Sequence, residues 1–361
     1  MRNPIRPHAA VCAVVALTCG AFVSGVQATR DRRPAATAIG TQDEQPPRVE
    51  RLAGNPIIRP EMLPGTDGEN INGPSLIRVP DWLEQPLGRY YLYFSHHGGQ
   101  YIRLAYADAL AGPWRIHARG TLHLRDVPAA SGHVASPDVI VDDERREFRL
   151  YVHGPAVAAP GQKTFVAVSK DGLDFRASDE ILGLFYMRIF RWGGWWYGMA
   201  KGGLLHRSRD GLTRFEQGPN PFPGSELRDA EYNDHGPRHV ALHLVGNRLR
   251  VYYTSIGDAP ERIFRTSLDL SHDWTTWRTS PPVEVLRPEF EYEGVALPVQ
   301  PSKAGAGKAR EHALRDPAIF EDTDGRVYLV YAVAGESGLA IAELHEPPAR
   351  PVEQPERQRL H

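Results

Sequence analysis

The sequence predicts an all-β protein, a five-bladed β-propeller of four-stranded antiparallel blades. Five segments repeat one design, an apolar and aromatic-rich run, a few small or polar residues, a second strand-like run and a polar or Asp-Gly turn. The repeat recurs every roughly 50 to 70 residues, which is typical of antiparallel blades. The 31 prolines and 34 glycines also fit a turn-rich chain better than a helical one.

The five segments follow one another along the chain, and each supplies strands of one blade. The first two read YYLYFSHHGGQYIRLAYADALAGPW and FRLYVHGP, the latter continuing to TFVAVSKDGLDF. The third reads WWYGMAKGGLLHRSRDGLTRF, the fourth runs from LRVYYTSIGD to RIFRTSLDLSHDW, and the fifth reads VYLVYAVAGESGLAIAEL. Their ranges are 90–114, 148–175, 195–215, 249–274 and 327–344. Between Arg51 and Leu344 there is room for five blades of roughly 60 residues each.

The N-terminus has the pattern of a secretion signal. Arg2 and Arg6 precede an apolar run over 9–23 that is too short to span a bilayer, and Ala28 offers a small residue for cleavage. A retained membrane anchor is the alternative. The pattern predicts a secreted or periplasmic protein. The predicted organisation is a signal peptide over 1–28, a disordered leader over 29–50, a propeller domain over 51–345 and a disordered tail over 346–361.

The composition excludes several kinds of site. Both cysteines, Cys12 and Cys19, lie inside the predicted signal, so the mature chain has no disulfide, thiolate zinc site or cysteine nucleophile. The formal net charge of −2 does not favour a nucleic-acid or anionic-membrane partner. No membrane contact is expected after cleavage of the signal, and no cofactor is predicted.

Two histidines flank one predicted hairpin. His133 opens the segment SGHVASPDVIVDD and His153 closes FRLYVHG, with the turn DDERR near the midpoint between them. Because the two ends of a hairpin lie side by side, the imidazoles should meet. If that end faces the propeller axis, the pair can exchange a proton near neutral pH. The alternative is two partly buried histidines that cap strand ends.

A tyrosine and a lysine flank the next hairpin, in GLFYMRIFRWGGWWYGMAKGG. The same reasoning places Tyr186 near Lys201. A neighbouring cation lowers the pKa of a phenol, which suits Tyr186 as a general acid or base. The alternative is an ordinary strand tyrosine. His133, His153 and Tyr186 are therefore the candidate catalytic residues.

Further cations and imidazoles begin or end strands in the other blades. His97 follows the first strand run, Arg238 and His239 follow a Gly-Pro pair, and Arg315 precedes an Asp-Pro pair. With Lys201, these four residues form a candidate substrate-binding set for a carboxylate. Surface salt bridges are the alternative for any single arginine. No metal is predicted; the alternative is a structural divalent cation on the axis, held by His97, His239 or a neighbouring histidine, which no ligand-spacing motif supports.

The blade openings VDDERREFRLYVHG and FEDTDGRVYLVY resemble the five-bladed propellers of glycoside hydrolase family 43 and its relatives. The resemblance implies the propeller fold and carbohydrate handling. Those hydrolases carry a carboxylate base in blade one and a glutamate acid in blade three. They also have a second Asp in blade two, where this chain has Asp138. Blade one, however, reads NGPS over 72–75 and blade three reads Tyr186-Met187-Arg188, so the base and the acid are missing from their expected places. Hydrolysis needs two carboxyl groups across the bond, so these departures weigh against that mechanism.

The pairs His133/His153 and Tyr186/Lys201 resemble the active-site motif of propeller polysaccharide lyases, the ulvan lyases and rhamnose–glucuronate lyases. This chain departs from them in having lysine where they have arginine, and five repeats where they have seven blades. The resemblance implies β-elimination from a uronate, with its carboxylate neutralised by Arg238, Lys201 or a protonated histidine. Tyr186 or a histidine would remove the proton.

Three hypotheses for function follow. The first is a lyase that acts on an acidic, uronate-containing oligo- or polysaccharide. The second is a family 43-like hydrolase with displaced carboxylates, and the third is a propeller that binds glycans without cleaving them. The carboxylates available to a hydrolase are Asp138, Glu231, Asp234, Glu293 and Asp316.

Overall fold

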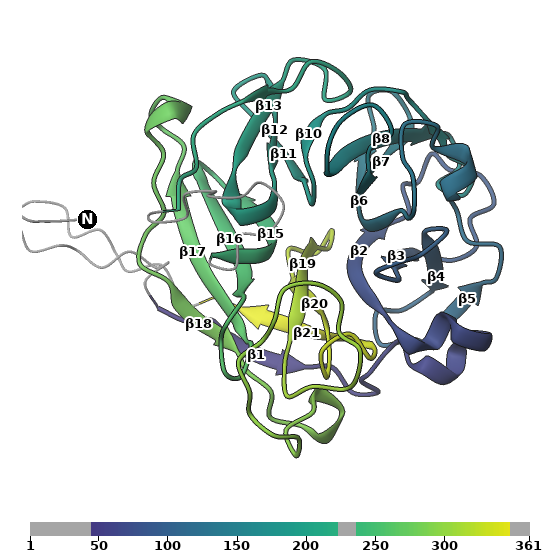
Figure 1. Cartoon of the computed structure of the whole chain (residues 1–361), viewed down its shortest axis with the longest axis vertical. Helices are drawn as coiled ribbons and strands as arrows, with labels where there is room; N and C mark the ends of the chain where they lie inside the picture. Colours follow the sequence, from purple (N-terminus) through teal and green to yellow (C-terminus); the bar gives the residue numbers. More distant parts are fainter. Residues whose placement is uncertain (1–44, 223–235, 347–361) are drawn as a thin grey trace, which may run out of the picture. The chain divides into compact units, whose positions relative to one another are not determined.

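The computed structural model describes residues 45–222 and 236–346, and these form a five-bladed β-propeller (Figure 1). Blade one contains β2 (Asn72–Arg78), β3 (Tyr90–Ser95), β4 (Arg103–Ala107) and β5 (Arg115–His117). Blade two contains β6 (Ala135–Asp142), β7 (Glu147–Pro155), β8 (Gln162–Ser169), β9 (Arg176–Ala177) and β10 (Gly183–Leu184). Blade three contains β11 (Arg188–Trp192), β12 (Trp195–Met199), β13 (Leu205–Ser208) and β14 (Glu216–Gln217).

Blade four contains β15 (Pro237–Val245), β16 (Arg248–Ser255), β17 (Ile263–Asp269) and β18 (Val283–Leu286). Blade five contains β19 (Arg315–Glu321), β20 (Val327–Ala332), β21 (Leu339–His345) and β1 (Arg48–Arg51). The helices in the described ranges are short 3₁₀ turns, namely η2 (Pro60–Met62), η3 (Gly65–Glu69), η4 (Leu124–Asp126), η5 (Lys201–Gly203), η6 (Trp274–Thr276) and η7 (Glu291–Glu293). The predicted all-β, five-bladed architecture is confirmed.

Four blades are four-stranded antiparallel sheets, as predicted, and blade two differs at its outer edge. There two strands of two residues each, β9 and β10, both pair with β8. The first strands of the blades, β2, β6, β11, β15 and β19, contact one another in a closed ring around the axis (Figure 1). Side chains at the beginnings of these strands are therefore brought together from all five blades.

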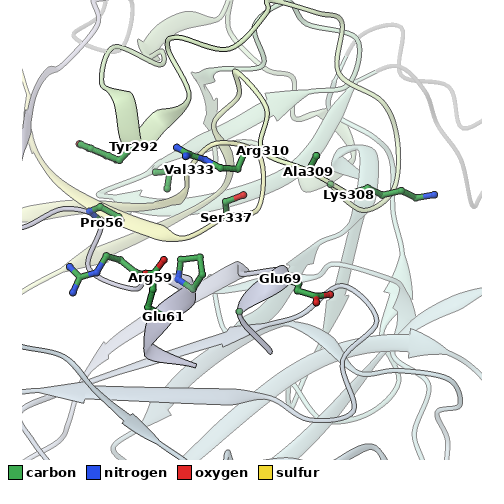
Figure 2. Close-up of a pocket in the computed structure, with 13 residues that line it drawn as sticks. Pro56, Arg59, Glu61, Glu69, Tyr292, Lys308, Ala309, Arg310, Val333 and Ser337 are labelled. Carbon is green, nitrogen blue, oxygen red and sulfur yellow. The ribbon is translucent and has the colours of Figure 1, made fainter. Parts of the chain in front are cut away.

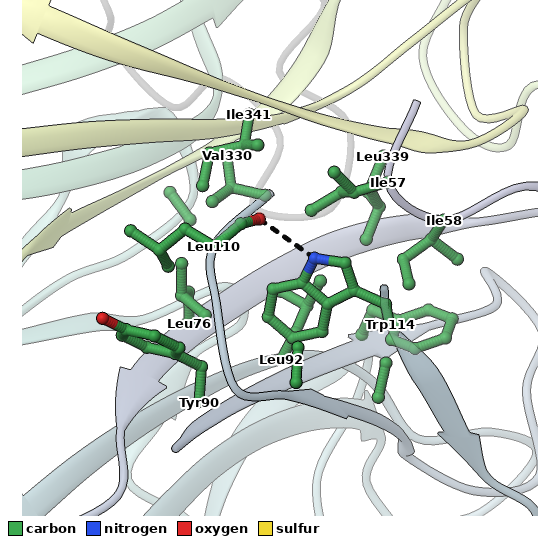
Figure 3. Close-up of a cluster of buried hydrophobic side chains, with 14 of the residues drawn as sticks. Ile57, Ile58, Leu76, Tyr90, Leu92, Leu110, Trp114, Val330, Leu339 and Ile341 are labelled. Carbon is green, nitrogen blue, oxygen red and sulfur yellow. Dashed lines mark hydrogen bonds between the residues drawn. The ribbon is translucent and has the colours of Figure 1, made fainter. Parts of the chain in front are cut away.

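The middle strands are apolar on both faces because each blade stacks between two others. All six side chains of β3 (YYLYFS) and of β20 (VYLVYA) are buried. Five clusters of buried apolar residues fill the five gaps between neighbouring blades. In the gap between blades five and one, Trp114 packs among Leu92, Leu339 and Ile341, and its indole N–H donates to the carbonyl of Leu110 at 3.1 Å (Figure 3). This packing excludes water and fixes the blades around the axis.

Strand β1 completes blade five and corrects the predicted domain boundary. Arg48–Arg51 pairs antiparallel with β21, so the propeller includes residues that the sequence analysis assigned to the leader over 29–50. The polar sequence RVER carries no apolar alternation, and only the partner strand makes it β-structure. Glu346, assigned to the tail, forms an ion pair with Arg265 at 2.6 Å.

The predicted signal peptide, most of the leader and residues 347–361 of the tail lie outside the described residues. No helix within 45–222 and 236–346 combines the length and apolar character that a membrane crossing requires.

Candidate active site

The inner strands begin with residues in the left-handed region of backbone conformation. Gly73, Ser136, Tyr186 and Asp316 have φ values of 56°, 45°, 64° and 50°. Gly73, Ser136 and Asp316 lie in β-bulges at which the ladder of the inner strand shifts register. Bulges of this kind re-aim side chains and are common beside active sites. At the corresponding position of blade one only glycine fits, because a Cβ on Gly73 would lie 2.9 Å from the Cα of Ser136.

The structure brings His133 and His153 together. Their ring centroids lie 5.8 Å apart in an edge-to-face arrangement, because the β6–β7 register pairs Ala135 with His153. The Nε2 atom of His133 lies 3.1 Å from Oε1 of Gln162, which orients its ring. His153 is buried, and burial lowers its pKa well below the usual value, with further lowering from His133 and His239. His153 is therefore neutral at physiological pH.

The ring of Tyr186 lies between two imidazoles. Its centroid is 4.1 Å from that of His153 and 4.0 Å from that of His239, and both contacts are near perpendicular. The left-handed backbone of Tyr186 places its ring there, just before β11 begins. The arrangement joins groups from blades two, three and four at one point on the axis.

His239 also contacts a carboxylate of blade five. Its Nδ1 atom is hydrogen-bonded to Oδ1 of Asp316, whose Oδ2 accepts the backbone N–H of Gly73 at 3.2 Å. Burial opposes ionisation of Asp316, but His239, Arg238 and Arg315 outweigh it and hold the pKa of this carboxyl below its usual range. Burial lowers the pKa of His239 more than Asp316 raises it, so the pair is a neutral imidazole on a carboxylate.

An axial pocket of about 100 Å³ opens beside these rings. Lys201 is placed in its wall by η5, where its backbone N–H donates to the carbonyl of Phe185 at 2.9 Å. Its Nζ atom donates to the carbonyl of Arg238 at 3.3 Å. The structure thus brings Lys201 to the same wall as Tyr186. The lining residues are His97, Gln162, Phe185, Tyr186, Lys201, Arg238, His239, Ile256, Ala304, Gly305 and Glu336.

The two predicted arginines hold a buried carboxylate that the sequence analysis missed. Arg238 donates to Glu261 at 2.6 and 3.2 Å, and Arg315 donates to the same carboxylate at 2.8 Å. Glu261 is 0% exposed, and Arg315 also pairs with Glu311 at 2.5 Å and Glu336 at 3.5 Å, so both cations are compensated inside the protein. Arg238 still lines the pocket, whereas Arg315 lies behind it. Of the two arginines in the predicted substrate-binding set, Arg315 therefore does not line the pocket, and Arg238 lines it while paired with Glu261.

A second buried carboxylate lies at the blade-five side of the pocket. Glu336 accepts from the amides of Asn70 and Asn72, the latter at 3.1 Å, and its Oε2 lies 3.6 Å from Nδ1 of His97. Burial raises the pKa of Glu336, but the bond to His97 and the charge of Arg315 outweigh it, so that pKa is lowered. Glu336 follows β20 in a loop without any motif, which is why sequence reasoning missed it.

Arg188 holds the inner ends of several blades together. Its guanidinium donates to the carbonyl of Pro137 at 2.5 Å, of Pro74 at 3.2 Å and of Val240 at 3.2 Å. It also contacts Asp138 at 3.3 Å, and burial raises the pKa of that carboxyl. Arg188 and Asp138 thus join blades one to four below the pocket.

The other carboxylates proposed for hydrolysis differ in position. Glu293 is buried away from the axis, where it accepts from Arg51 at 2.7 Å and from Tyr331 at 2.8 Å. Glu231 and Asp234 lie outside the described residues. Across 45–222 and 236–346, no group of three or more His, Cys, Asp or Glu side chains has an arrangement that would hold a metal ion.

A larger cavity of about 490 Å³ lies next to the axial pocket. Arg59 and Glu61 face Tyr292 and Arg310 across it (Figure 2). One loop borders both spaces, since Gly305 lines the axial pocket and Gly307 lines this cavity. Its size is within the range of small-ligand sites, and it offers aromatic, cationic and acidic groups.

Comparison with curated proteins gives one informative relative. Over 324 residues the chain is 39% identical to "Uncharacterized protein R118" of Acanthamoeba polyphaga mimivirus, an alignment that covers 82% of this chain and 90% of that protein. No family model matches the sequence.

Solved structures with the same fold include glycoside hydrolases of low sequence identity. A GH43_1 enzyme from Xanthomonas citri has a TM-score of 0.52 at 14% identity, covering 77% of this chain and 89% of that one. An α-L-arabinofuranosidase from Lactobacillus brevis has a TM-score of 0.52 at 12% identity, covering 80% and 92%. An endo-arabinase from Bacteroides thetaiotaomicron has a TM-score of 0.53 at 11% identity, covering 78% and 95%. At these identities the similarity establishes a common propeller fold.

Proposed function

The chain belongs to the family of mimivirus protein R118, and we propose that it is a carbohydrate-active enzyme that cleaves a uronate-containing glycan by β-elimination in its axial pocket. The observation that carries the proposal is the ring of Tyr186 held between the imidazoles of His153 and His239, with Lys201 in the same wall. Imidazole and phenol groups can transfer protons. Glycosidases use carboxyl groups instead, and none of these three side chains carries one.

The reaction balances with groups from the chain alone. A base removes the proton on C5 of the uronate, and the electron pair moves into the carboxylate as an enolate-like intermediate. The pair then forms the C4–C5 double bond while the C4–O bond breaks, and an acid gives the departing oxygen a proton. The products are an unsaturated uronate and a glycan with a free hydroxyl group.

We assign Lys201 to charge stabilisation of the intermediate because it lines the pocket. Arg238 reaches the pocket with its charge already compensated by Glu261, so it contributes hydrogen bonds more than net charge. Lys201 is 6% exposed, and in such a buried wall an ammonium group acts at low dielectric. A donor aimed at the developing charge contributes about 3 to 4 kcal/mol in comparable enzymes.

The second candidate function is glycoside hydrolysis, which the comparisons favour over elimination. The solved structures with this fold are named as hydrolases, a xylose-binding GH43_1 enzyme and arabinan-directed enzymes among them. Glu336 lines the pocket and Asp316 lies directly behind His239, so two carboxyl groups are present near the axis. Both already accept hydrogen bonds from the protein, which is why the side chains favour elimination.

One experiment separates the two reactions. The protein is incubated with a panel of uronate-containing and neutral glycans, and both new reducing ends and the ultraviolet absorbance of an unsaturated uronate are measured. The expected result is that the two signals rise together on uronate substrates. Reducing ends without the absorbance would replace the proposal by hydrolysis. Binding without either signal would replace it by a glycan-binding propeller.

A further inference from the structure

The two ring nitrogens of His239 have very different surroundings. Nδ1 is hydrogen-bonded to Asp316, whereas Nε2 is buried and has no hydrogen-bond partner among the residues that the structure describes. Buried polar atoms are almost always hydrogen-bonded, and exceptions at a pocket often have a chemical role. His239 lines the axial pocket, although its Nε2 atom is itself buried in the structure.

Asp316 determines which nitrogen carries the proton. Its second oxygen is engaged by the backbone N–H of Gly73, and its side chain is 1% exposed, so the carboxylate is fixed in place. An ionised carboxylate only accepts hydrogen bonds, so Nδ1 of His239 must be the donor. In the neutral ring Nε2 is then the acceptor, as in other histidines held by a carboxylate.

His153, the other imidazole beside Tyr186, is not held by a carboxylate among the described residues. His153 is buried, and its Nδ1 atom has no hydrogen-bond partner within the described ranges. Within 45–222 and 236–346 no carboxylate is hydrogen-bonded to it, and the rings packed on it are His133, Phe185 and Tyr186. Of the two imidazoles that flank Tyr186, His239 is the one whose tautomer the protein fixes.

We infer that His239 is the base of the reaction and that Asp316 is the residue that positions it, holding the proton on Nδ1 so that Nε2 accepts the C5 proton. The inference deepens the proposed elimination and rests on it for the identity of the proton. It leaves Tyr186 as the acid that protonates the departing oxygen. Among the residues that the structure describes, the charged and titratable groups around His239 are Asp316 on β19, Arg238 on its own strand, Lys201 on η5, Tyr186 before β11 and His153 on β7.

The chain contains a matched control pair. His243 and Glu321 lie on the same two strands, β15 and β19, and Nε2 of His243 is 3.0 Å from Oε2 of Glu321. Neither residue lines the axial pocket. Glu321→Gln therefore removes a histidine–carboxylate contact between the same strands without touching the pocket.

The test reads the tautomer directly. Protein with ¹⁵N-labelled histidine is examined by long-range ¹H–¹⁵N spectroscopy at neutral pH, and the His239 signals are assigned with His239→Gln. We expect the proton on Nδ1 in the wild type, and a rise of the Nε2-protonated form in Asp316→Asn. A wild-type proton on Nε2, or on both nitrogens, would overturn the inference whatever the enzyme does.

The kinetic test uses the same variants on the glycan that the panel identifies. Asp316→Asn should lower kcat by about 100-fold or more with little change in KM, as expected for loss of base catalysis. The acid limb of the pH profile of kcat should move to lower pH in Asp316→Asn, because Asp316 raises the pKa of His239 in the wild type. Glu321→Gln should keep the wild-type values. An unchanged kcat in Asp316→Asn would refute the role of the pair, whereas the expected tautomer in a protein that cleaves no glycan would refute only the proposed function.

Discussion

The carboxylate of Glu261 and the guanidinium of Arg238 form a bidentate pair at 2.6 and 3.2 Å inside the propeller, and Arg238 also lines the axial pocket. The same carboxylate binds Arg315, so one buried anion serves two cations from blades four and five. A pocket that looks strongly cationic in sequence is thereby close to balanced. Under the proposed function, selectivity for an acidic glycan would come from a few groups rather than from a large positive field.

Tyr186→Phe should abolish most turnover while leaving substrate binding nearly intact. The ring that packs between His153 and His239 is kept, and only the hydroxyl that transfers a proton in the proposed reaction is removed. General acid catalysis of this kind contributes about 100- to 10,000-fold. Steady-state kinetics and a separate binding titration measure the two effects. Tyr106→Phe, at a half-buried tyrosine on β4, is the control, and full activity of Tyr186→Phe would remove Tyr186 from the mechanism.

Glu261→Gln should destabilise the protein by about 3 to 5 kcal/mol, since it removes the buried carboxylate that Arg238 binds, while Arg315 keeps Glu311 and Glu336. Urea unfolding provides the measurement. The matched variant is Glu284→Gln, which breaks more exposed ion pairs with Arg262 and Arg287. Glu284→Gln should lower the free energy of unfolding by about 1 kcal/mol or less. Equal losses in the two variants would contradict the role assigned to Glu261.

Arg188→Met should weaken the ring of blades by at least about 3 kcal/mol. Three carbonyl groups, from Pro74, Pro137 and Val240, would lose their donor in a buried site, and each costs about 1 to 3 kcal/mol. Arg191→Met removes an exposed arginine from the same strand and should change little. Thermal unfolding of both variants compares them, and equal melting temperatures would argue against Arg188 as the link between blades.

Stability should fall as the pH drops from about 6.5 to about 4, partly because of His206. Burial lowers the pKa of His206 to about 4, so the unfolded chain binds its proton at a higher pH than the folded protein does. The protonated unfolded state is then favoured as the pH falls, by up to about 3 kcal/mol for this residue. His206→Gln should flatten the dependence of unfolding free energy on pH. His272→Gln, at an exposed histidine, should not, and unchanged slopes in both variants would contradict the prediction.

The sequence was enough to predict which residues lie close together where the pairing of strands in one hairpin determines the contact. The hairpin argument brings His133 to His153 and Tyr186 to Lys201 because strand pairing fixes which ends meet. The five repeats likewise fix the number of blades. The functions proposed for these side chains remain predictions.

The parts that the sequence did not reveal depend on contacts between distant segments. Glu261 and Glu336 lie in loops whose sequences carry no motif, and only the closed ring brings them to Arg238 and Arg315. Asp316 appeared as one carboxylate among several, and its partner on β15 is 77 residues away. The strand character of Arg48–Arg51 was hidden for the same reason, because β21 supplies the partner.

Arg48 pairs with His345 across β1 and β21, so the first and last strands of the propeller lie side by side in one sheet. A covalent link at that seam, with a new opening in a turn between two other blades, would leave every sheet intact. Circular permutants that begin at a different blade should therefore form the same five sheets. They offer a way to move the chain ends to another blade without disturbing the residues at the axis.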